Sequence, residues 1–232
     1  MADKPDRRRP SWWFAVTGWL KESAALVGSV VTLVAAGAAL LAFLGGDETS
    51  AEVPVVARLT GPGGVSERAF FTHSGETLVS TQYANQEGLS AVWRGADGEH
   101  RATVRIDPRS KRSTGFTLLH LDGETGPQRH FAVANGSSLK PGAPVKAYIS
   151  DTATTDGEVL AVGTRSDVLG VGEIDNLLVV GEVGRATEGG TPLLDERNRV
   201  VGMLFAEEAG GVGRTMVIPI EDIRAAFPEA FD

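Results

Sequence analysis

Hydroxyl, imidazole and carboxyl side chains are the groups of this sequence that could carry covalent catalysis. Few of them lie in a sequence context that indicates a catalytic role. Thr191 follows two glycines and precedes Pro192, so its hydroxyl belongs to a glycine-rich loop. A threonine nucleophile needs an adjacent base, whereas a threonine in a turn commonly satisfies local backbone groups. The sequence favours the turn role and leaves Thr191 as the one rescue candidate for a nucleophile.

The histidines are the possible bases or metal ligands of this chain. There are four of them, His73, His100, His120 and His130. No two stand at the spacing that zinc ligands require, and the absence of cysteine excludes a thiolate site and a disulfide framework. We therefore expect most of these histidines to be solvated surface residues, and we expect no metal and no cofactor.

The charge of the chain is uneven along its length. The formal net charge is −8, and residues 1–51 contain equal numbers of basic and acidic residues, so the remainder carries the whole excess. A domain with that balance repels phosphate backbones. Nucleic acid is therefore excluded as an expected partner.

Short alternating apolar segments with glycine-rich turns fill the chain from Glu52 onwards, which predicts an all-β barrel or sandwich. A first group of expected strands comprises Val53–Leu59, Ala69–Phe71, Thr77–Ser80, Ala91–Trp93, Ala102–Ile106 and Phe116–Leu121. A second comprises Val145–Ile149, Val159–Val162, Asn176–Val180, Pro192–Leu194, Val200–Phe205 and Thr215–Ile218. One helix is expected near the end, where Ile220, Ile223 and Phe227 form an apolar stripe before Pro228.

The hairpin after Thr191 carries a resemblance to a known family. Pro192-Leu-Leu-Asp195, a polar turn and Val200-Val-Gly202 resemble the segment that follows the nucleophile of trypsin-like serine peptidases of the HtrA/Deg type. In those peptidases Ser-Gly-Gly precedes Pro-Leu-Leu-Asp. Aligned without a gap, Gly189 stands at the place of the nucleophilic serine.

Four further segments are similar to the same family and extend the resemblance over most of residues 55–227. Gly75 to Tyr83 resembles the strand that ends at the catalytic histidine, which puts Tyr83 at that place, or Gln82 after a slip of one residue. Asp107 to Leu121 resembles the segment with the catalytic aspartate, and Gly115 takes its place. Ser137–Tyr148 and Gly213–Ile220 resemble the opening and closing segments of the second barrel.

The resemblance implies two six-stranded antiparallel β-barrels followed by a short C-terminal helix. It places the double barrel at 52–232, with a first barrel at 52–135, a second at 136–219 and the helix at 220–227. It also implies that the triad-equivalent positions Tyr83, Gly115 and Gly189 lie together. Glycine offers no nucleophile, and tyrosine, with an ordinary pKa near 10, is a poor base at neutral pH.

The function that follows is that of a pseudoprotease, a binding or scaffold module for a protein or an extended peptide. This fold binds a peptide as an added strand, here along Met203, Leu204, Phe205, Ala206, Glu207 and Glu208. Two alternatives remain open. One is an active endopeptidase with displaced residues, such as Thr191 with His73 or His120, and the other is an accessory subunit of a membrane complex.

The segment before the barrels predicts a membrane anchor. Ala24 to Leu44 contains no charged residue, and a bilayer core of roughly 30 Å needs about 20 such residues. The apolar core of a cleaved signal peptide is shorter, so an uncleaved transmembrane helix is favoured at 24–44, followed by a linker at 45–51. The lipid bilayer is then an expected partner, and small residues from Gly28 to Ala38 would permit close helix contact.

Charges on either side of the predicted span give its orientation. Arg7, Arg8 and Arg9 precede it, whereas Asp47 and Glu48 follow it. The positive-inside rule therefore predicts a single-pass protein with residues 1–23 cytoplasmic or interfacial and the C-terminal domain extracytoplasmic. The tryptophan-rich stretch Ser11–Leu20 would either lie at the headgroup level or extend the helix.

Overall fold

The computed structural model describes residues 54–95, 97–123, 128–134, 139–150, 153–168, 171–181, 183, 188–207 and 213–232. The predicted membrane span at 24–44 and its flanks lie outside the described residues. Within the described part of the chain, no helix is long and apolar enough to cross a bilayer. The residues Val53–Asp232 form one compact unit.

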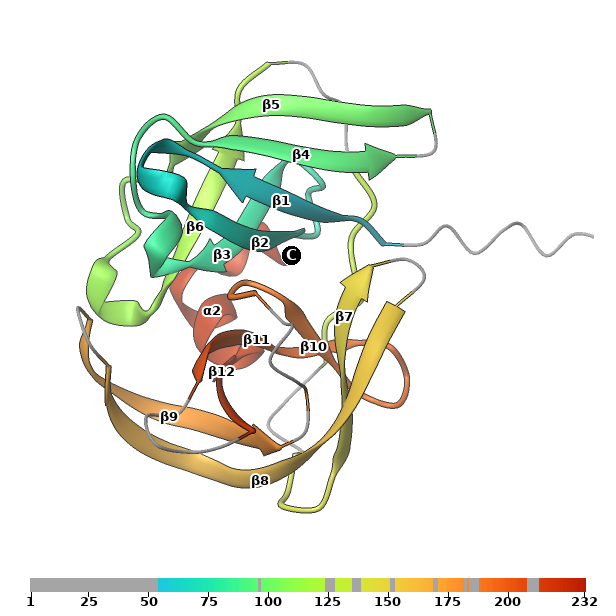
Figure 1. The fold of residues 1–232 in the computed structure, drawn as a ribbon, viewed down its shortest axis with the longest axis vertical. Coiled ribbons are helices and arrows are strands. Elements are labelled where there is room, and N and C mark those ends of the chain that lie inside the picture. Colours follow the sequence, from blue (N-terminus) through green and yellow to red (C-terminus); the bar gives the residue numbers. More distant parts are fainter. Residues whose placement is uncertain are drawn as a thin grey trace, which may run out of the picture. The chain divides into compact units, whose positions relative to one another are not determined.

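Two antiparallel sheets of six strands make up this unit (Figure 1). The strands of the first sheet are β1 (Val56–Thr60), β2 (Ser66–Phe71), β3 (Thr77–Thr81), β4 (Ser90–Gly95), β5 (Gly98–Ile106) and β6 (Phe116–Leu121). Those of the second are β7 (Pro144–Ser150), β8 (Ala153–Val168), β9 (Gly172–Gly181), β10 (Pro192–Leu194), β11 (Val200–Glu207) and β12 (Arg214–Pro219). The all-β class, the two groups of six strands and their antiparallel pairing, which the sequence predicts, are confirmed.

Each sheet closes on itself into a barrel. In the first sheet β1 pairs with both β2 and β4, which gives the order β1-β2-β3-β6-β5-β4. In the second, β10 pairs with both β11 and β7, which gives the order β10-β11-β12-β9-β8-β7. Closure removes the unpaired edges that an open sheet would expose.

Buried apolar side chains form three clusters, because several strands are covered on both faces. The core of the first barrel includes Leu59, Phe71, Leu78 and Leu119. The core of the second barrel includes Val145, Val159, Val180, Leu193 and Val217. The third cluster lies where the two barrels meet and includes Phe70, Phe116, Met203, Phe205, Ile218 and Ile223. Neighbouring residues such as Phe70 and Phe71 therefore pack into different cores, which fixes how the barrels join.

The short helix α2 (Ile220–Ala226) follows β12 directly and packs on the junction cluster. Ile220 and Ile223 of this helix and Phe227 directly after it are buried, as the apolar stripe predicts. Pro228 begins a one-turn 3₁₀ helix, η4 (Pro228–Ala230), so the α-helix ends where the proline was expected to end it.

The hairpin of β10 and β11 has the predicted turn. Asp195 accepts hydrogen bonds at Oδ1 from the backbone N–H groups of Arg197 and Arg199, both at 2.9 Å. Asn198 has φ of 57°, a conformation that asparagine tolerates better than most residues. The side chain of Asp195 thus supplies the bonds that close the turn.

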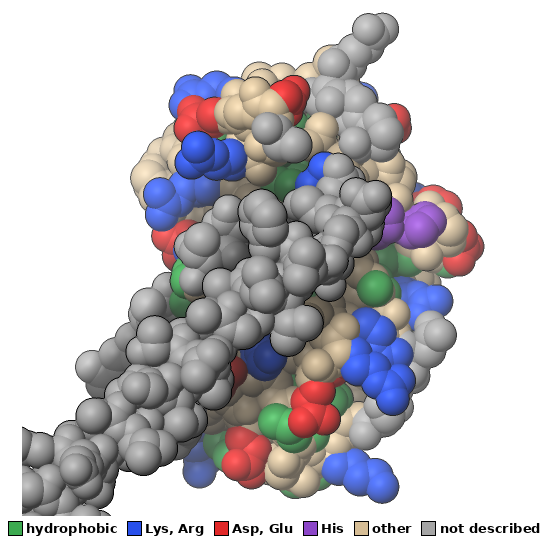
Figure 2. Space-filling view, turned by 90° about the vertical axis from the view of Figure 1, so that its right-hand side faces the viewer, with side chains coloured by type: hydrophobic (Ala, Val, Ile, Leu, Met, Phe, Trp, Pro, Cys, Tyr) green, Lys and Arg blue, Asp and Glu red, His purple; other side chains and the backbone are tan. Residues whose placement is uncertain are grey.

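A long ribbon of β8 and β9 is larger than the sequence predicts. The apolar pattern indicated only Val159–Val162, whereas β8 extends to Val168 with several register shifts against β9. In its outer half Arg165 pairs with Glu173 at 2.7 Å and with Asp175. Basic and acidic side chains are also interspersed over the visible part of the face in Figure 2.

A second polar cluster ties the C-terminal segment to the first barrel. Asp107 is buried and accepts hydrogen bonds at 2.9 Å from Nε and Nη2 of Arg109 and from Nε2 of His120. Arg109 also pairs with Glu229, and its guanidinium carbon lies 5.1 Å from the centre of the Phe227 ring. Hydrogen bonds from Arg109, followed by that from His120, hold the pKa of Asp107 well below its usual range despite burial.

Candidate functional site

The loop Glu188–Thr191 is held between the two barrels by backbone hydrogen bonds. The carbonyl of Gly189 accepts from the N–H of Arg68 on β2 at 2.8 Å. On the other side the N–H of Gly190 donates to the carbonyl of Leu204 on β11 at 2.8 Å. A Cβ at Gly190 would lie 1.8 Å from the carbonyl oxygen of Arg68, so only glycine allows this approach.

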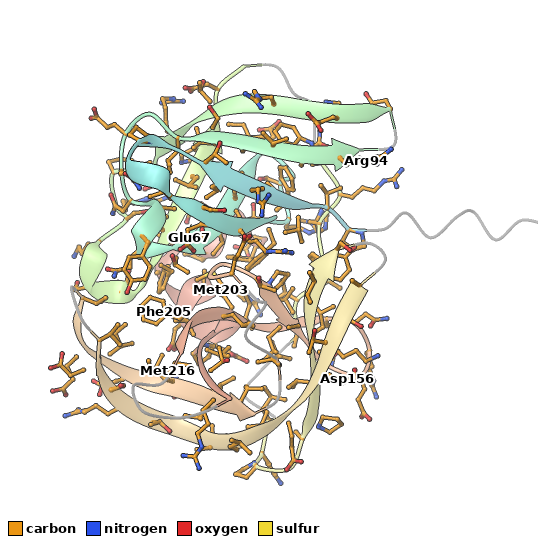
Figure 3. The ribbon with its side chains drawn as sticks, in the orientation of Figure 1. Glu67, Arg94, Asp156, Met203, Phe205 and Met216 are labelled. Atoms are coloured by element: carbon orange, nitrogen blue, oxygen red, sulfur yellow. The ribbon has the colours of Figure 1, made fainter. Side chains whose placement is uncertain are left out.

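The space where a side chain at position 189 would begin is occupied by Glu67. A Cβ built on Gly189 would lie 2.5 Å from Oε2 of Glu67 and 3.0 Å from Cγ2 of Thr81. Figure 3 shows Glu67 on the first barrel at the junction with the second, near Met203 and Phe205 of β11. A carboxyl therefore stands at the place that the resemblance assigns to the serine.

The negative charge of the Glu67 carboxyl has little compensation in this position. Its Oε2 accepts one hydrogen bond, from Oγ1 of Thr81 at 3.0 Å. Burial, and to a smaller extent the neighbouring Glu188, raises the pKa of Glu67 to about 7, although the Thr81 bond opposes the rise. In the described part of the chain no ion pair includes Glu67, because the nearest arginines, Arg58 and Arg68, pair with Glu188.

Two arginines of the first barrel hold the neighbouring Glu188. Arg58 Nη2 donates to Oε1 of Glu188 at 2.9 Å, and Arg68 Nε donates to Oε2 at 3.2 Å. Arg68 also donates to the backbone carbonyl of Ile149 on β7. Arg68 therefore links the first barrel, the loop and the second barrel in one set of contacts.

Tyr83 lies two residues after Thr81, and its ring lies against Phe205 of β11. It belongs to the 3₁₀ turn η2 (Gln82–Ala84), whose start is fixed by a hydrogen bond from the Tyr83 N–H to Oγ1 of Thr81 at 3.3 Å. Its ring stacks on Phe205 with centres 6.0 Å apart and an angle of 11° between the planes. Tyr83 is 42% exposed, which leaves part of the ring open to a ligand.

Gly115 adjoins the same turn, because its carbonyl accepts a hydrogen bond from the N–H of Gln82 at 3.0 Å. It has φ of 80°, a conformation that favours glycine. A Cβ at this position would lie 2.8 Å from Cδ1 of Ile174 and 2.9 Å from Cδ1 of Ile218. The backbone conformation and the packing both oppose an aspartate here.

The three triad-equivalent positions are thus connected through one short segment, Thr81 to Tyr83. Thr81 contacts the space beside Gly189, Gln82 bonds to Gly115, and Tyr83 covers Phe205. Gln82 is buried, and its Oε1 has no hydrogen-bond partner among the described residues. The side chains on this segment or bonded to it include the carboxyl of Glu67, the ring of Tyr83 and the amide of Gln82.

The rescue candidate Thr191 is fully buried. Its hydroxyl donates to the backbone carbonyl of Glu188 at 2.6 Å, the local turn bond that the sequence favours. The histidines weighed as its base have other neighbours, since His120 bonds to Asp107 and the His73 ring lies against that of His130, 4.5 Å between centres. No hydrogen bond between Thr191 and a histidine is found in the described part of the chain.

His100 also has its own partners, since it bonds to Asp97 at 2.6 Å and stacks on Trp93. Across the described residues, no group of three or more histidine, cysteine, aspartate or glutamate side chains could hold a metal ion.

The predicted peptide-binding edge divides into two parts. Met203 and Leu204 are buried and have partners on both sides, since β11 pairs with β12 and also contacts Pro192 and Thr191. Beyond Leu204, within the described residues, Ala206 and Glu207 pair with β12 alone, after a register shift at Phe205. Glu208 lies outside the described residues. An added strand would therefore run along Phe205 to Glu207, next to the ring of Tyr83.

Sequence reasoning missed Glu67, Thr81 and the arginine pair. The apolar pattern predicts a strand from Ala69, whereas β2 begins at Ser66. The available signal was the acidic residue Glu67 two positions before the apolar run Ala69 to Phe71, which is buried throughout. Its proximity to Gly189 depends on the joining of two barrels and has no local signal.

Comparisons with known proteins give a likeness in structure. No protein-family model and no curated protein sequence matches the chain. Among solved structures, the MamO protease domain from Magnetospirillum magneticum is similar with a TM-score of 0.63 and 19% identity, over 74% of this chain and 95% of that one.

Two further solved structures resemble the chain to a similar degree. Deg5 has a TM-score of 0.59 and 15% identity, over 74% of this chain and 86% of that one. The HtrA-type protease AlgW with a tripeptide has a TM-score of 0.57 and 19% identity, over 74% of this chain and 58% of that one. At such identities the likeness concerns the fold, and the chain therefore has the fold of trypsin-like serine proteases of the HtrA type.

Proposed function

We propose that this chain is a pseudoprotease, a non-catalytic module that binds a protein or an extended peptide outside the cytoplasm and is anchored in the membrane. The observation that carries the proposal is the Glu67 carboxyl beside Gly189, within 2.5 Å of where a nucleophile's Cβ would stand. A nucleophile needs an adjacent base and room for the substrate carbonyl. Here a carboxyl fills the room and glycine supplies no nucleophile.

The other two triad-equivalent positions support the same proposal. Gly115 is packed so closely against Ile174 and Ile218 that a carboxylate could enter only with movement of both. Tyr83 places an aromatic ring on Phe205 instead of an imidazole in the loop. Losing a whole catalytic group leaves at most the small residual rate due to binding and oxyanion contacts.

Peptide binding by strand addition does not depend on the triad, because it uses main-chain hydrogen bonds along a strand. Ala206 and Glu207 pair with β12 on one side, and the ring of the partly exposed Tyr83 lies over Phe205. An extended peptide laid along this segment would gain backbone hydrogen bonds and cover an aromatic side chain. Apolar burial of this kind supplies much of the binding energy in peptide complexes.

The test of the proposal combines catalysis and binding on the full chain in mild detergent. We expect no hydrolysis of casein above the buffer rate and no covalent label from a fluorophosphonate probe, for the natural chain and for Thr191→Val alike. Casein hydrolysis that Thr191→Val abolishes would contradict the proposal and favour the displaced nucleophile. Gly189→Ser alone should restore nothing, because Glu67 remains in place and no imidazole is supplied.

Binding is measured with a random nonapeptide library passed over the immobilised chain. Tyr83→Asp should reduce the retained peptide at least about tenfold, because it removes the aromatic face and adds a charge. Leu160→Asp is the matched control, since Leu160 is 41% exposed and lies on β8. Equal losses in both variants would mean that Tyr83 has no special role.

We infer membrane attachment from the uncharged stretch Ala24–Leu44 and from Arg7 to Arg9 before it. The chain lacks cysteine, so single cysteines can report the side of the membrane. A cysteine replacing the exposed Arg94 should react with an impermeant maleimide in intact cells, and one replacing Asp3 should react only after lysis. The reverse pattern, or release of the protein by alkaline carbonate, would contradict the inference.

A further inference from the structure

We propose that the peptide-binding face selects peptides with a basic residue, whose cation pairs with the Glu67 carboxyl and lies against the Tyr83 ring. This inference rests on the proposed function and names the chemistry of the ligand. It is carried by the arrangement of Glu67, Thr81 and Tyr83, which no part of the trypsin-like reaction requires.

The charge at Glu67 has no partner of opposite sign in the described part of the chain. Its one hydrogen bond comes from the neutral hydroxyl of Thr81, at 3.0 Å. The two nearest arginines are engaged by Glu188, Arg58 at 2.9 Å and Arg68 at 3.2 Å, and Arg68 also bonds to Ile149. Both arginines thus compensate the negative charge of Glu188. The charge of Glu67 beside it has no such partner among the described residues.

A partly buried carboxyl in this state is a binding site for a cation. Transfer of an ionised carboxylate from water is costly unless it is paired. Burial is the largest cause of the raised pKa of Glu67, and within the described residues only the Thr81 hydroxyl opposes it. A guanidinium or ammonium group from a ligand would compensate the cost of burial and would gain a charge-assisted hydrogen bond.

The exposed face of Tyr83 provides a second feature that favours a cation. Tyr83 and Glu67 flank Thr81, which bonds to the backbone of the first and the side chain of the second. The tyrosine ring is fixed by stacking on Phe205 and keeps 42% of its surface exposed. Aromatic faces attract arginine and lysine side chains, arginine more often. A carboxyl bonded to Thr81 and a fixed ring two residues along the chain favour a basic side chain over a neutral one.

The position of the pair also fits a peptide on β11. Gly190, next to the glycine that contacts Glu67, donates to the Leu204 carbonyl, and Phe205 follows directly. A strand added along Phe205 to Glu207 would therefore pass close to Glu67. One basic side chain of that strand can reach the carboxyl while the backbone keeps its hydrogen bonds.

The test uses two nonapeptide libraries that differ only at the central residue, arginine in one and its neutral analogue citrulline in the other. The full chain in mild detergent is immobilised near pH 8, where Glu67 is ionised, and retained peptide is quantified by mass spectrometry. We expect the arginine library to be retained at least about fivefold better. Glu67→Gln should remove this preference and keep the retention of the citrulline library unchanged.

The matched control is Glu76→Gln, which removes an exposed acidic residue from the turn between β2 and β3. It should keep the arginine preference, as should salt at a concentration that screens surface charges. Equal retention of the two libraries, or a preference that survives in Glu67→Gln, would overturn this inference while leaving the proposed function intact. No retention of either library would overturn both. The thermal unfolding of Glu67→Gln shows separately that the variant is folded.

Discussion

Two acidic side chains of the first barrel, Asp107 and Glu67, differ in the hydrogen-bond donors that surround their carboxyl groups. Asp107 is buried with donors from Arg109 and His120, and these bonds lower its pKa. Glu67 has one hydroxyl donor, and burial raises its pKa to about 7. Hydrogen bonds from Arg109 and His120 favour the charged form of Asp107, whereas burial opposes the charged form of Glu67.

Removing the hydrogen-bonded charge of Asp107 should have the largest effect on the free energy of unfolding. Asp107→Asn loses charge-assisted bonds to Arg109 and His120 and leaves those donors short of a partner, so we expect a loss of about 2–4 kcal/mol in the free energy of unfolding near pH 7. Urea unfolding measures it. Because the pKa of Asp107 is lowered, this contribution is present above the ordinary aspartate pKa and is lost as the pH falls below it.

The control for this variant is Asp122→Asn, which breaks the exposed ion pair with Arg105. Exposed pairs contribute about 0–1 kcal/mol, so the control should change stability little. Equal losses in the two variants would mean that burial of Asp107 does not distinguish the two regions.

Removing the charge of Glu67 should change the free energy of unfolding in the opposite direction. The pKa of Glu67 in the folded chain is above the ordinary value, so its contribution to stability is complete at low pH and is lost as the pH rises through about 7. Glu67→Gln should therefore stabilise the chain by about 1–2 kcal/mol near pH 8, a value reduced for residual contact with water, and by almost nothing near pH 4. The measurement is the difference between the two unfolding free energies across pH.

A constant difference between Glu67→Gln and the natural chain across this range would contradict the assignment, since it would indicate changed packing and not a titrating carboxyl. A loss of stability near pH 8 would show that Glu67 is already paired.

A smaller effect should reveal the contact between Glu67 and Gly189. Gly189→Ala places a Cβ 2.5 Å from Oε2 of Glu67, so the carboxyl must turn away, at a cost of about 1 kcal/mol. In the background of Glu67→Ala the same change should be neutral or should stabilise by about 0.5 kcal/mol, because alanine restricts the unfolded chain. The coupling is obtained from a double-mutant cycle by urea unfolding. Additive effects would mean that the two positions do not touch.

The smallest effects should separate the two arginines that hold Glu188. Arg58 is mostly exposed, and Arg58→Ala should cost less than about 0.5 kcal/mol. Arg68 is largely covered and also bonds to Ile149, so Arg68→Ala should cost about 1–2 kcal/mol. Thermal unfolding measures both, and the reverse order would show that Arg68 is not the link between the barrels.

The strands and the loop were predictable because local pattern specifies them. The apolar pattern indicated part of each strand, and the Gly189 to Pro192 segment indicated the loop. The outer half of β8 was missed because it is polar and is held by ion pairs with β9, which no alternation reports. Glu67 was missed for a different reason. Its neighbour Gly189 is distant in sequence, and the contact exists only after the two barrels have joined.

We propose above all that this site holds a peptide and does not cut it. This proposal is tested most directly by recovering the arginine-centred nonapeptides after prolonged incubation with the full chain and measuring their masses. The account predicts that the bound peptides are recovered at full length, with the same masses as peptides kept in buffer. Shorter fragments that appear with the natural chain and disappear with Thr191→Val would contradict it.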